Sequence, residues 1–212
     1  MPKQDPQKVV DSLYEKYYEG DKARHGVFLE LANCFTPKRV LYPGGFIHVN
    51  ASFVFPSVTY VDNDKNAKRF FKCHNEVRAL IDQSKDYADP SAFKFYGQSY
   101  EDPLDEADGS FDMLISLYAG FISKPCKRYL SSGGILVVNN SHGDAGLASL
   151  DDEFTLIGVL KGQGDQYKFS EKNLNDYFHP KKDIKVTEAY LRETGKGVGY
   201  TKTAPIYLFK KK

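Results

Sequence analysis

The 212-residue chain lacks several features that would place it in a specialised class of protein. Its three cysteines, Cys34, Cys73 and Cys126, form no close pair, so the sequence indicates neither a disulfide framework nor a cysteine-based zinc site. Nowhere do eighteen apolar residues run together, and residues 1–5 are polar and carry no apolar signal core. We therefore expect a soluble, cytoplasmic protein without a membrane partner.

The chain also lacks a net charge of either sign. Its 29 Lys and Arg residues oppose 28 Asp and Glu residues, so no large electrostatic field draws the molecule toward nucleic acid. This balance favours a small-molecule substrate over a nucleic acid, and it leaves the oligomeric state open. A chain of this length, with 41% hydrophobic residues, can bury one core without metals or disulfides.

Three familiar catalytic motifs are missing as well. The glycine-rich stretch GKGVGYTKT at residues 195–203 has the wrong spacing for a phosphate-binding P-loop. Neither a Gly-x-Ser-x-Gly elbow nor a His-Glu-x-x-His pair occurs. His142 and Asp144 together supply at most two ligands, so we expect no metal site.

The sequence does contain an ordered series of helical and strand patterns. Asp5 and Pro6 predict the start of a helix that Gly20 ends, and a second helix is expected over 24–35. From residue 37 onward, short apolar runs bounded by Gly, Pro and Asp alternate with helical stretches, the pattern of a mostly parallel sheet. The candidate strands are 39–42, 58–61, 93–96, 113–116, 135–139, 155–160 and 206–209.

We therefore predict a single α/β domain with a Rossmann-like, doubly wound, mostly parallel sheet of seven strands. Further helices are expected at 66–83, 125–129 and 170–178, and a strand near 184–191. The predicted parts are an N-terminal helical extension (1–36), a nucleotide-binding core (37–160), an insertion (161–204) and a final strand (205–212).

The ends of the first two predicted strands carry the residues of a nucleotide site. In an open parallel sheet, ligands bind at the carboxyl ends of the strands. The first strand runs into Tyr42-Pro43-Gly44-Gly45, and the second ends at Asp62. Glycines allow backbone to approach a ligand closely, and a carboxylate offers two hydrogen-bond acceptors to a ribose diol. The glycine pair alone is also the pattern of an ordinary tight turn.

Four segments in order resemble the class I S-adenosylmethionine-dependent methyltransferases. VLYPGG resembles the first-strand motif, and VTYVDND the second strand with its ribose-binding acid. FYGQSYEDPLDEADGSFDMLIS resembles the adenine-contacting loop and fourth strand, and RYLSSGGILVVNN the turn and fifth strand. The resemblance covers residues 39–160 and implies a Rossmann-like fold, S-adenosylmethionine as cofactor and methyl transfer to an acceptor.

The resemblance also implies a set of cofactor contacts. The glycine turn would lie against the methionine part, Asp62 on the ribose and Asn63 beside the adenine. The implied cofactor residues are Tyr42, Pro43, Gly44, Gly45, Asp62, Asn63, Gln98, Ser99, Ser116 and Leu117. Four positions depart from the family pattern: Tyr42 replaces the usual acid of the first strand, Phe46 and His48 replace later glycines, and Gln98 stands where an acid is common. A phenyl ring at position 46 would block the cofactor or redirect the loop.

A polar cluster over residues 139–144 follows the fifth predicted strand, on the face where the resemblance implies that the acceptor lies. Methyl transfer needs alignment of the reacting atoms, and it needs a base only when the nucleophile must lose a proton. His142 is the candidate base and Asp144 its orienting partner. The alternative is that Asp144 caps a short helix over 145–150 and that the other polar side chains satisfy a loop. The remaining candidates are Tyr118 near the transferred methyl group and His48, Asn139 and Asn140 at the acceptor.

The roles of two further residues stay open, and the sequence leaves three functions to consider. Arg24 and His25 either cover the site from the N-terminal helices or form a charged helix end in water. The first function is methyl transfer from S-adenosylmethionine to a small acceptor. The alternative is a non-catalytic nucleoside-binding or regulatory protein on the same fold. An NAD-dependent oxidoreductase is a third possibility, which the altered glycine loop disfavours.

Overall fold

The computed structural model describes residues 5–18 and 22–212; Gly20, the predicted end of the first helix, lies outside them. Helix α1 (Pro6–Tyr17) begins as predicted, because the Asp5 carboxylate accepts the backbone N–H of Gln7 at 3.1 Å. Pro6 stands in the first turn, where its missing N–H costs nothing. Helix α2 (Lys22–Cys34) follows, so two helices precede the sheet.

Within the described residues, eight strands form one sheet in the order β3-β2-β1-β4-β5-β8-β6-β7. Strands β1 to β5 pair in parallel, β8 runs antiparallel to both β5 and β6, and β7 runs antiparallel to β6. The predicted α/β class and mostly parallel sheet are confirmed. The strands are β1 (Val40–Pro43), β2 (Ser57–Val61), β3 (Ala92–Tyr96), β4 (Phe111–Ser116), β5 (Leu130–Val138), β6 (Phe154–Gln163), β7 (Gln166–Ser170) and β8 (Ile206–Lys211).

The strand count of seven was wrong, because β7 adds an eighth strand inside the predicted insertion. The helix expected at 170–178 does not form there; a single turn of 3₁₀ helix, η2 (Leu174–Asp176), follows β7 instead. Strand β7 pairs with β6 as a hairpin from Val159 opposite Ser170 to Gln163 opposite Gln166. Strand β7 ends at Ser170, where the helix was expected to begin, and only residues 174–176 of the expected helix are helical.

The predicted strand near 184–191 was also wrong. Helix α8 (Glu188–Thr194) occupies the end of this stretch, and the Thr187 hydroxyl caps it by accepting the backbone N–H of Tyr190 at 3.2 Å. The helix expected over 66–83 is divided at Cys73 into α4 (Lys65–Lys72) and α5 (His74–Ser84). The helix expected over 125–129 is a short helix, α6 (Ser123–Cys126), followed by the 3₁₀ helix η1 (Lys127–Tyr129).

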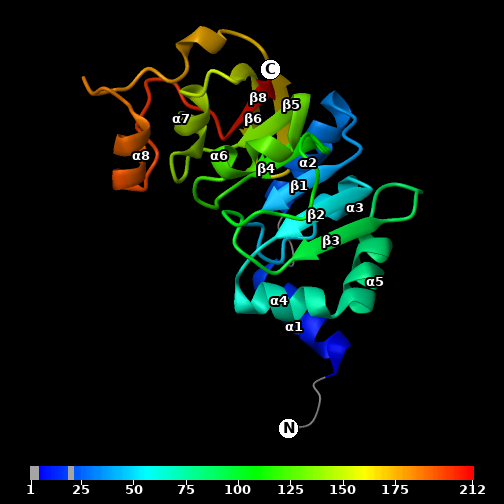
Figure 1. Cartoon of the computed structure of the whole chain (residues 1–212). Coiled ribbons are helices and arrows are strands. Elements are labelled where there is room, and N and C mark those ends of the chain that lie inside the picture. The colour runs from blue at the N-terminus through cyan, green and yellow to red at the C-terminus, as the bar shows by residue number, and fades with distance from the viewer. Residues whose placement is uncertain (1–4, 19–21) are drawn as a thin grey trace.

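Helices cover both faces of the sheet. Successive residues of β1 point to opposite faces, so Val40 and Tyr42 join one apolar cluster and Leu41 joins the other. The first cluster packs against α1, α2, α3 (Ala51–Val54), α4 and α5, and the second against α6 and α7 (Asp144–Ser149). In Figure 1, α4 and α5 lie beside β3 at one end of the sheet, and α7 and α8 lie together at the other end.

Strand β7 is tied to α2 through a glutamate. The buried carboxylate of Glu30 accepts the backbone N–H of Phe169 at 2.8 Å, so the outer edge of β7 donates into the helix. A Cβ atom on Gly26 would collide with the carbonyl of Asp165, so the hairpin turn approaches α2 more closely than any other residue would allow. Across the described part of the chain, no helix combines the length and the apolar character needed to cross a membrane.

Candidate functional site

The glycine turn after β1 is a closely packed connection between three strand ends. The Gly44 N–H donates to the carbonyl of Val61 at 2.8 Å, which joins the ends of β1 and β2. Gly44 has φ +64°, and a Cβ atom there would collide with the side chain of Ala119 beyond β4. A Cβ atom on Gly45 would lie 3.2 Å from the ring of Tyr42. Gly44 is therefore required by the local geometry, whereas a side chain at position 45 would need the Tyr42 ring to shift slightly.

Asp62 is held in place by two backbone amides. Its Oδ2 accepts the N–H of Phe46 at 2.9 Å, and its Oδ1 accepts the N–H of Asp64 at 2.8 Å. A carboxylate offers about four acceptor positions, so two remain for a ligand. The side chain is half-buried, and its neighbour Asn63 is exposed. The acid after β2 is thus oriented before any ligand arrives.

Phe46 turns its ring toward α1. The ring meets Tyr17 edge-on with 5.2 Å between centroids and lies 6.1 Å from the ring of Tyr18. Its backbone has φ +54°, a conformation that a non-glycine residue adopts only when the surroundings hold it. The altered position redirects the loop: the side chain packs on the helical extension, and the N–H faces Asp62.

His48 is buried beneath the N-terminal helices, with its ring against that of Tyr18. Burial, reinforced by the nearby positive charge of Arg24, lowers the pKa of His48 from 6.5 to about 2. The imidazole is therefore neutral at physiological pH. Because only 2% of this residue is exposed, the structure gives it a core position in the loop rather than one at an open mouth.

Arg24 lies over the ends of two strands. Its guanidinium donates to the hydroxyl of Tyr42 at 3.1 Å and stands 5.0 Å from the ring centroid of Tyr118. The neighbouring His25 faces elsewhere and meets Asp86 at 3.3 Å. Of the two candidate covering residues, Arg24 reaches the edge where the cofactor was predicted, because Tyr42 ends β1 and Tyr118 follows β4.

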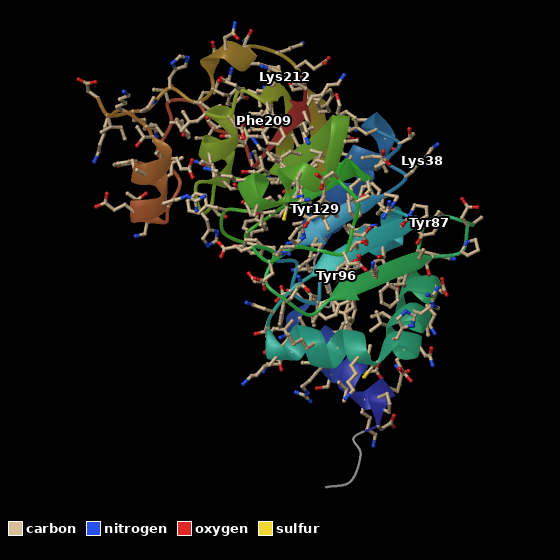
Figure 2. The ribbon with its side chains drawn as sticks, in the orientation of Figure 1. Lys38, Tyr87, Tyr96, Tyr129, Phe209 and Lys212 are labelled. Carbon is tan, nitrogen blue, oxygen red and sulfur yellow. The ribbon has the colours of Figure 1, made fainter. Side chains whose placement is uncertain are left out.

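The loop after β3 carries the two residues predicted at the adenine. The Gln98 amide donates to the carbonyl of Pro103 at 2.9 Å, and the Ser99 hydroxyl accepts the N–H of Glu101 at 3.2 Å. Two tyrosines, both labelled in Figure 2, hold this loop through hydrogen bonds. The hydroxyl of Tyr96 donates to the carbonyl of Asp105 at 2.7 Å, and that of Tyr129 accepts the N–H of Leu104 at 2.7 Å.

Asp144 serves a buried network instead of His142. Its carboxylate accepts the hydroxyls of Ser116 and Ser123, each at 2.5 Å, and the backbone N–H groups of Ser123 and Ile122. Burial raises the pKa of this carboxyl group, and the serine hydrogen bonds oppose the shift. Helix α7 begins at Asp144 itself, so the alternative of a side-chain cap does not hold either. Asp144 ties α7 to β4 and α6.

His142 stands exposed in the loop after β5 and has a different partner. The Ser141 hydroxyl donates to the Asn139 side-chain oxygen at 3.0 Å and lies 3.0 Å from Nδ1 of His142. A hydroxyl has one proton to donate, so the histidine Nδ1 donates to it and Nε2 carries the free lone pair. The Asn139 oxygen also accepts the N–H of Tyr118 at 3.3 Å. The predicted candidates Asn139, His142 and Tyr118 therefore belong to one chain of contacts.

Asn140 faces the C-terminal insertion. Its amide donates to the carbonyl of Val198 at 3.2 Å, and its side-chain oxygen accepts the N–H of Gly146 at 3.3 Å. Both polar ends of the side chain are thus used by the protein. Of the other predicted residues, Pro43, Ser116 and Leu117 are buried at the strand ends. Tyr118 is 55% exposed.

Two serines in the hydrogen bonds of Asp144 and His142 were assigned no role from the sequence. Ser123 meets Asp144 across a separation of 21 residues, and Ser141 gained significance only from its contact with the histidine beside it. Throughout residues 5–18 and 22–212, no three His, Cys, Asp or Glu side chains gather as a metal site.

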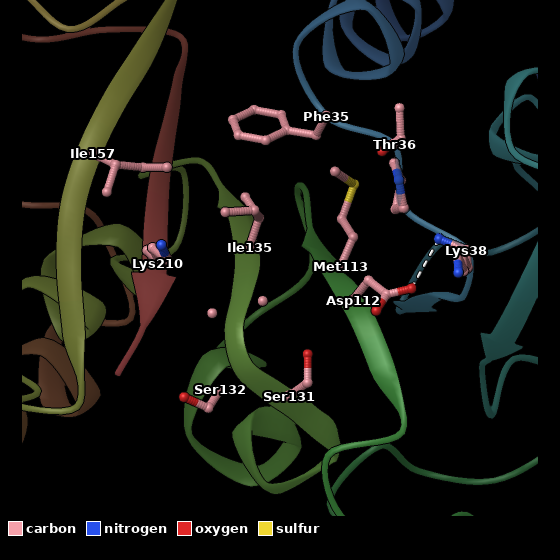
Figure 3. A pocket seen from close by; sticks show the side chains of 13 residues that line it. Phe35, Thr36, Lys38, Asp112, Met113, Ser131, Ser132, Ile135, Ile157 and Lys210 are labelled. Carbon is pink, nitrogen blue, oxygen red and sulfur yellow. Dashed lines mark hydrogen bonds between the residues drawn. The ribbon is translucent and has the colours of Figure 1, made fainter.

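A separate cavity of about 510 Å³ lies near the opposite ends of the strands (Figure 3). Phe35, Met113, Ile135 and Ile157 give it apolar walls. At its rim the Asp112 carboxylate accepts the backbone N–H of Lys38 at 2.8 Å. None of the predicted site residues lines this cavity.

Comparison with known proteins bears on the fold. No family profile matches the chain, and no curated protein matches it. A Corynebacterium glutamicum protein superposes with a TM-score of 0.51 at 11% identity, over 78% of this chain and 88% of its own. Cofactor-bound Rv0187 from MTB gives 0.50 at 11% identity, over 80% and 89%. A Geobacter sulfurreducens methyltransferase gives 0.48 at 16% identity, over 80% and 91%.

The strand order of this chain defines its fold. Parallel strands in the order β3-β2-β1-β4-β5 are followed by the reversed strand β8. The chain has a Rossmann-like, mostly parallel α/β fold, which it shares with the Corynebacterium glutamicum protein and with Rv0187. The resemblance found in the sequence is therefore confirmed at the level of fold. In this fold, the carboxyl ends of the parallel strands bring Gly44, Asp62, Tyr118 and Asn139 to one edge of the sheet.

Proposed function

We propose that the protein is an S-adenosylmethionine-dependent methyltransferase acting on a small acceptor. The observation that carries the proposal is the pre-oriented carboxylate of Asp62, fixed at 2.9 Å and 2.8 Å by the amides of Phe46 and Asp64 at the end of β2. Fixing the carboxylate before binding lowers the ordering cost of holding a ribose diol. The shared fold supports the same conclusion.

The residues of this edge fit the cofactor. Gly44 and Gly45 form a tight turn, packed against Ala119 and Tyr42, at the strand end where the methionine part is expected. Asp62 keeps acceptor positions for the ribose hydroxyls, and Phe46 packs its ring against α1. When bound, S-adenosylmethionine supplies an electrophilic methyl group on a sulfonium. The task of the protein is to align the acceptor with that group and to exclude water.

The acceptor side is built around His142. With Nδ1 donating to Ser141, Nε2 is the atom that takes a proton from an acceptor hydroxyl or amine. Ser141, rather than the predicted Asp144, fixes the tautomer. Tyr118 adds an exposed ring at φ +60° after β4, and such backbone strain in a non-glycine residue is characteristic of functional positions.

The first experiment measures cofactor binding. Calorimetry with S-adenosylhomocysteine should give saturable binding by the wild-type protein. A thermal-shift panel of S-adenosylmethionine, S-adenosylhomocysteine, methylthioadenosine, NAD and ATP should favour the sulfur nucleosides. A shift with ATP or NAD alone would support the nucleoside-binding alternative, and the absence of heat at millimolar ligand would overturn the proposal.

The second experiment measures catalysis. Methyl-labelled S-adenosylmethionine and a pool of small metabolites should yield labelled product with the wild-type protein. His142→Ala should lower that yield by about 10²- to 10⁴-fold, the usual contribution of a general base, while S-adenosylhomocysteine still binds. His179→Ala, a change at another exposed histidine, is the matched control. Equal yields from the two variants would remove His142 from the mechanism.

A further inference from the structure

A second cavity, of about 320 Å³, lies within the C-terminal insertion. It lies between the stretch around Lys181 and Lys182, helix α8, and the loop from Lys196 to Gly199, and it is partly open to solvent. Ile184, Tyr190 and Val198 supply its apolar wall. Val198 and Ile184 belong to a small apolar cluster with Leu191, so the wall has its own packed support.

The segment around this cavity carries an excess of positive charge, although the whole chain is nearly neutral. Residues 179–202 contain six Lys and Arg residues and three Asp and Glu residues, in a protein whose formal charge is only +1. One of the three acids, Glu188, is already engaged by Lys124 and Arg192. Lys181, Lys182 and Lys196 line the cavity, and among the described residues no ion pair engages any of these three lysines, whereas Arg192 and Lys202 are paired with Glu188 and Asp176.

The cavity is joined to the candidate active site through the loop after β5. The Asn140 amide donates to the carbonyl of Val198 at 3.2 Å, and a Cβ atom on Gly197 would collide with the backbone of Asn140. Helix α8 also packs against α7, beside which it appears in Figure 1. The walls of the cavity are therefore fixed to residues on both sides of His142, namely Asn140 before it and α7 after it.

We infer that this cavity binds the phosphate group of a phosphate monoester whose flat organic part rests on Tyr190 and Val198. Three ammonium groups suit a compact dianion better than a singly charged carboxylate, and the apolar wall suits an aromatic or heterocyclic ring. The inference rests on the proposed function, because it assigns the methyl acceptor to the class of small phosphorylated molecules. Bound by its phosphate, such an acceptor has its organic part held beside the loop of Asn140.

The test uses phenyl phosphate as probe and calorimetry on the full chain. The triple variant Lys181→Gln, Lys182→Gln, Lys196→Gln should weaken phenyl phosphate binding about tenfold or more, because charged hydrogen bonds are lost. A matched variant, Lys8→Gln, Lys65→Gln, Lys161→Gln, removes the same charge from exposed lysines elsewhere and should change the affinity less than about twofold. Equal weakening in both variants would overturn the inference, because the attraction would then be diffuse.

Three further binding measurements distinguish a small phosphorylated acceptor from the alternatives. Tyr190→Ala should weaken phenyl phosphate binding and leave inorganic phosphate binding unchanged; equal effects would remove the ring from the proposal. Polyuridylate binding that depends on the three lysines, with no phenyl phosphate binding, would replace the small acceptor by RNA. S-adenosylhomocysteine binding should be unchanged in the triple variant. If the wild-type protein bound phenyl phosphate but not S-adenosylhomocysteine, the proposed function would fail and the phosphate site would stand. Thermal unfolding of each variant checks that it is folded.

Discussion

The Oδ2 atom of Asp62 accepts the backbone N–H of Phe46 at 2.9 Å. Phe46 departs most from the glycine pattern of the first loop, and Asp62 is the acid that best matches the second-strand motif. A hydrogen bond therefore joins these two residues. A backbone N–H is present whatever the side chain, so phenylalanine can make this contact while its ring packs on Tyr17. Where the family pattern has a glycine, this loop carries a phenylalanine whose ring packs on α1.

Asp62→Ala should weaken S-adenosylhomocysteine binding about 100-fold, because two hydrogen bonds that the ribose hydroxyls would donate to a charged acceptor are lost. Calorimetry measures the effect. The exposed Asp152, between α7 and β6, provides the control Asp152→Ala, which should leave the affinity unchanged. Thermal unfolding distinguishes lost binding from lost structure, since the variant also deprives the Phe46 and Asp64 amides of their acceptor. An unchanged affinity in a folded Asp62→Ala protein would contradict the assignment.

Gly44→Ala should destabilise the protein more than Gly195→Ala does. Both glycines have positive φ, which costs an alanine about 1–2 kcal/mol. At Gly44 the new methyl group also collides with Ala119, whereas nothing lies within 4 Å of the corresponding position at Gly195. Urea denaturation should show an additional loss of about 1–3 kcal/mol for Gly44→Ala. Equal losses would mean that the turn after β1 has room that the structure does not show.

His48 should make stability depend on pH in the acidic range. Its pKa is about 2 in the folded protein against 6.5 ordinarily, so below pH 6.5 the unfolded chain binds a proton that the folded chain does not. The stability contributed by this neutral histidine is complete above pH 6.5 and is lost as the pH falls. Between about pH 7.5 and pH 5 the loss amounts to about 2 kcal/mol.

His48→Gln removes the titrating group, so the difference in unfolding free energy between wild type and variant should shrink as the pH falls. Denaturation at several pH values measures this difference. His179→Gln, at an exposed histidine, should instead run parallel to the wild type. A constant difference between wild type and His48→Gln would show that the imidazole is protonated within the folded protein.

Glu30→Ala should loosen the β6–β7 hairpin from α2. The variant leaves the N–H of Phe169 without the carboxylate that it meets at 2.8 Å, at a cost of about 1–3 kcal/mol. Glu30→Gln retains a side-chain oxygen and should cost less; the ion pair with Lys168 at 3.7 Å involves an exposed lysine and contributes little. Hydrogen exchange should show reduced protection in β7 for Glu30→Ala. Unchanged protection would mean that pairing with β6 alone holds the strand.

Local pattern was sufficient where an element forms its own contacts. Asp5 and Pro6 predicted the start of α1, since a cap depends only on neighbours in sequence. The apolar runs of β1, β2, β4 and β5 predicted buried parallel strands, because strands covered on both faces are apolar throughout. The sequence pattern failed at β7 and α8 because the stretch after residue 160 is polar and shows little apolar periodicity, although their partners, β6 and Thr187, are close in sequence.

The sequence alone determined the class of the protein: an α/β sheet with glycines after its first strand and an acid after its second. These features follow from residue type and spacing, which fix backbone freedom, charge and burial before any folding. Only the tertiary structure decided which polar groups meet. Folding brought Arg24 to Tyr42 and Tyr118, gave the carboxylate of Asp144 to Ser116 and Ser123, and left His142 to Ser141. Hydrogen bonds depend on distance in space, and except between adjacent residues the sequence does not state that distance.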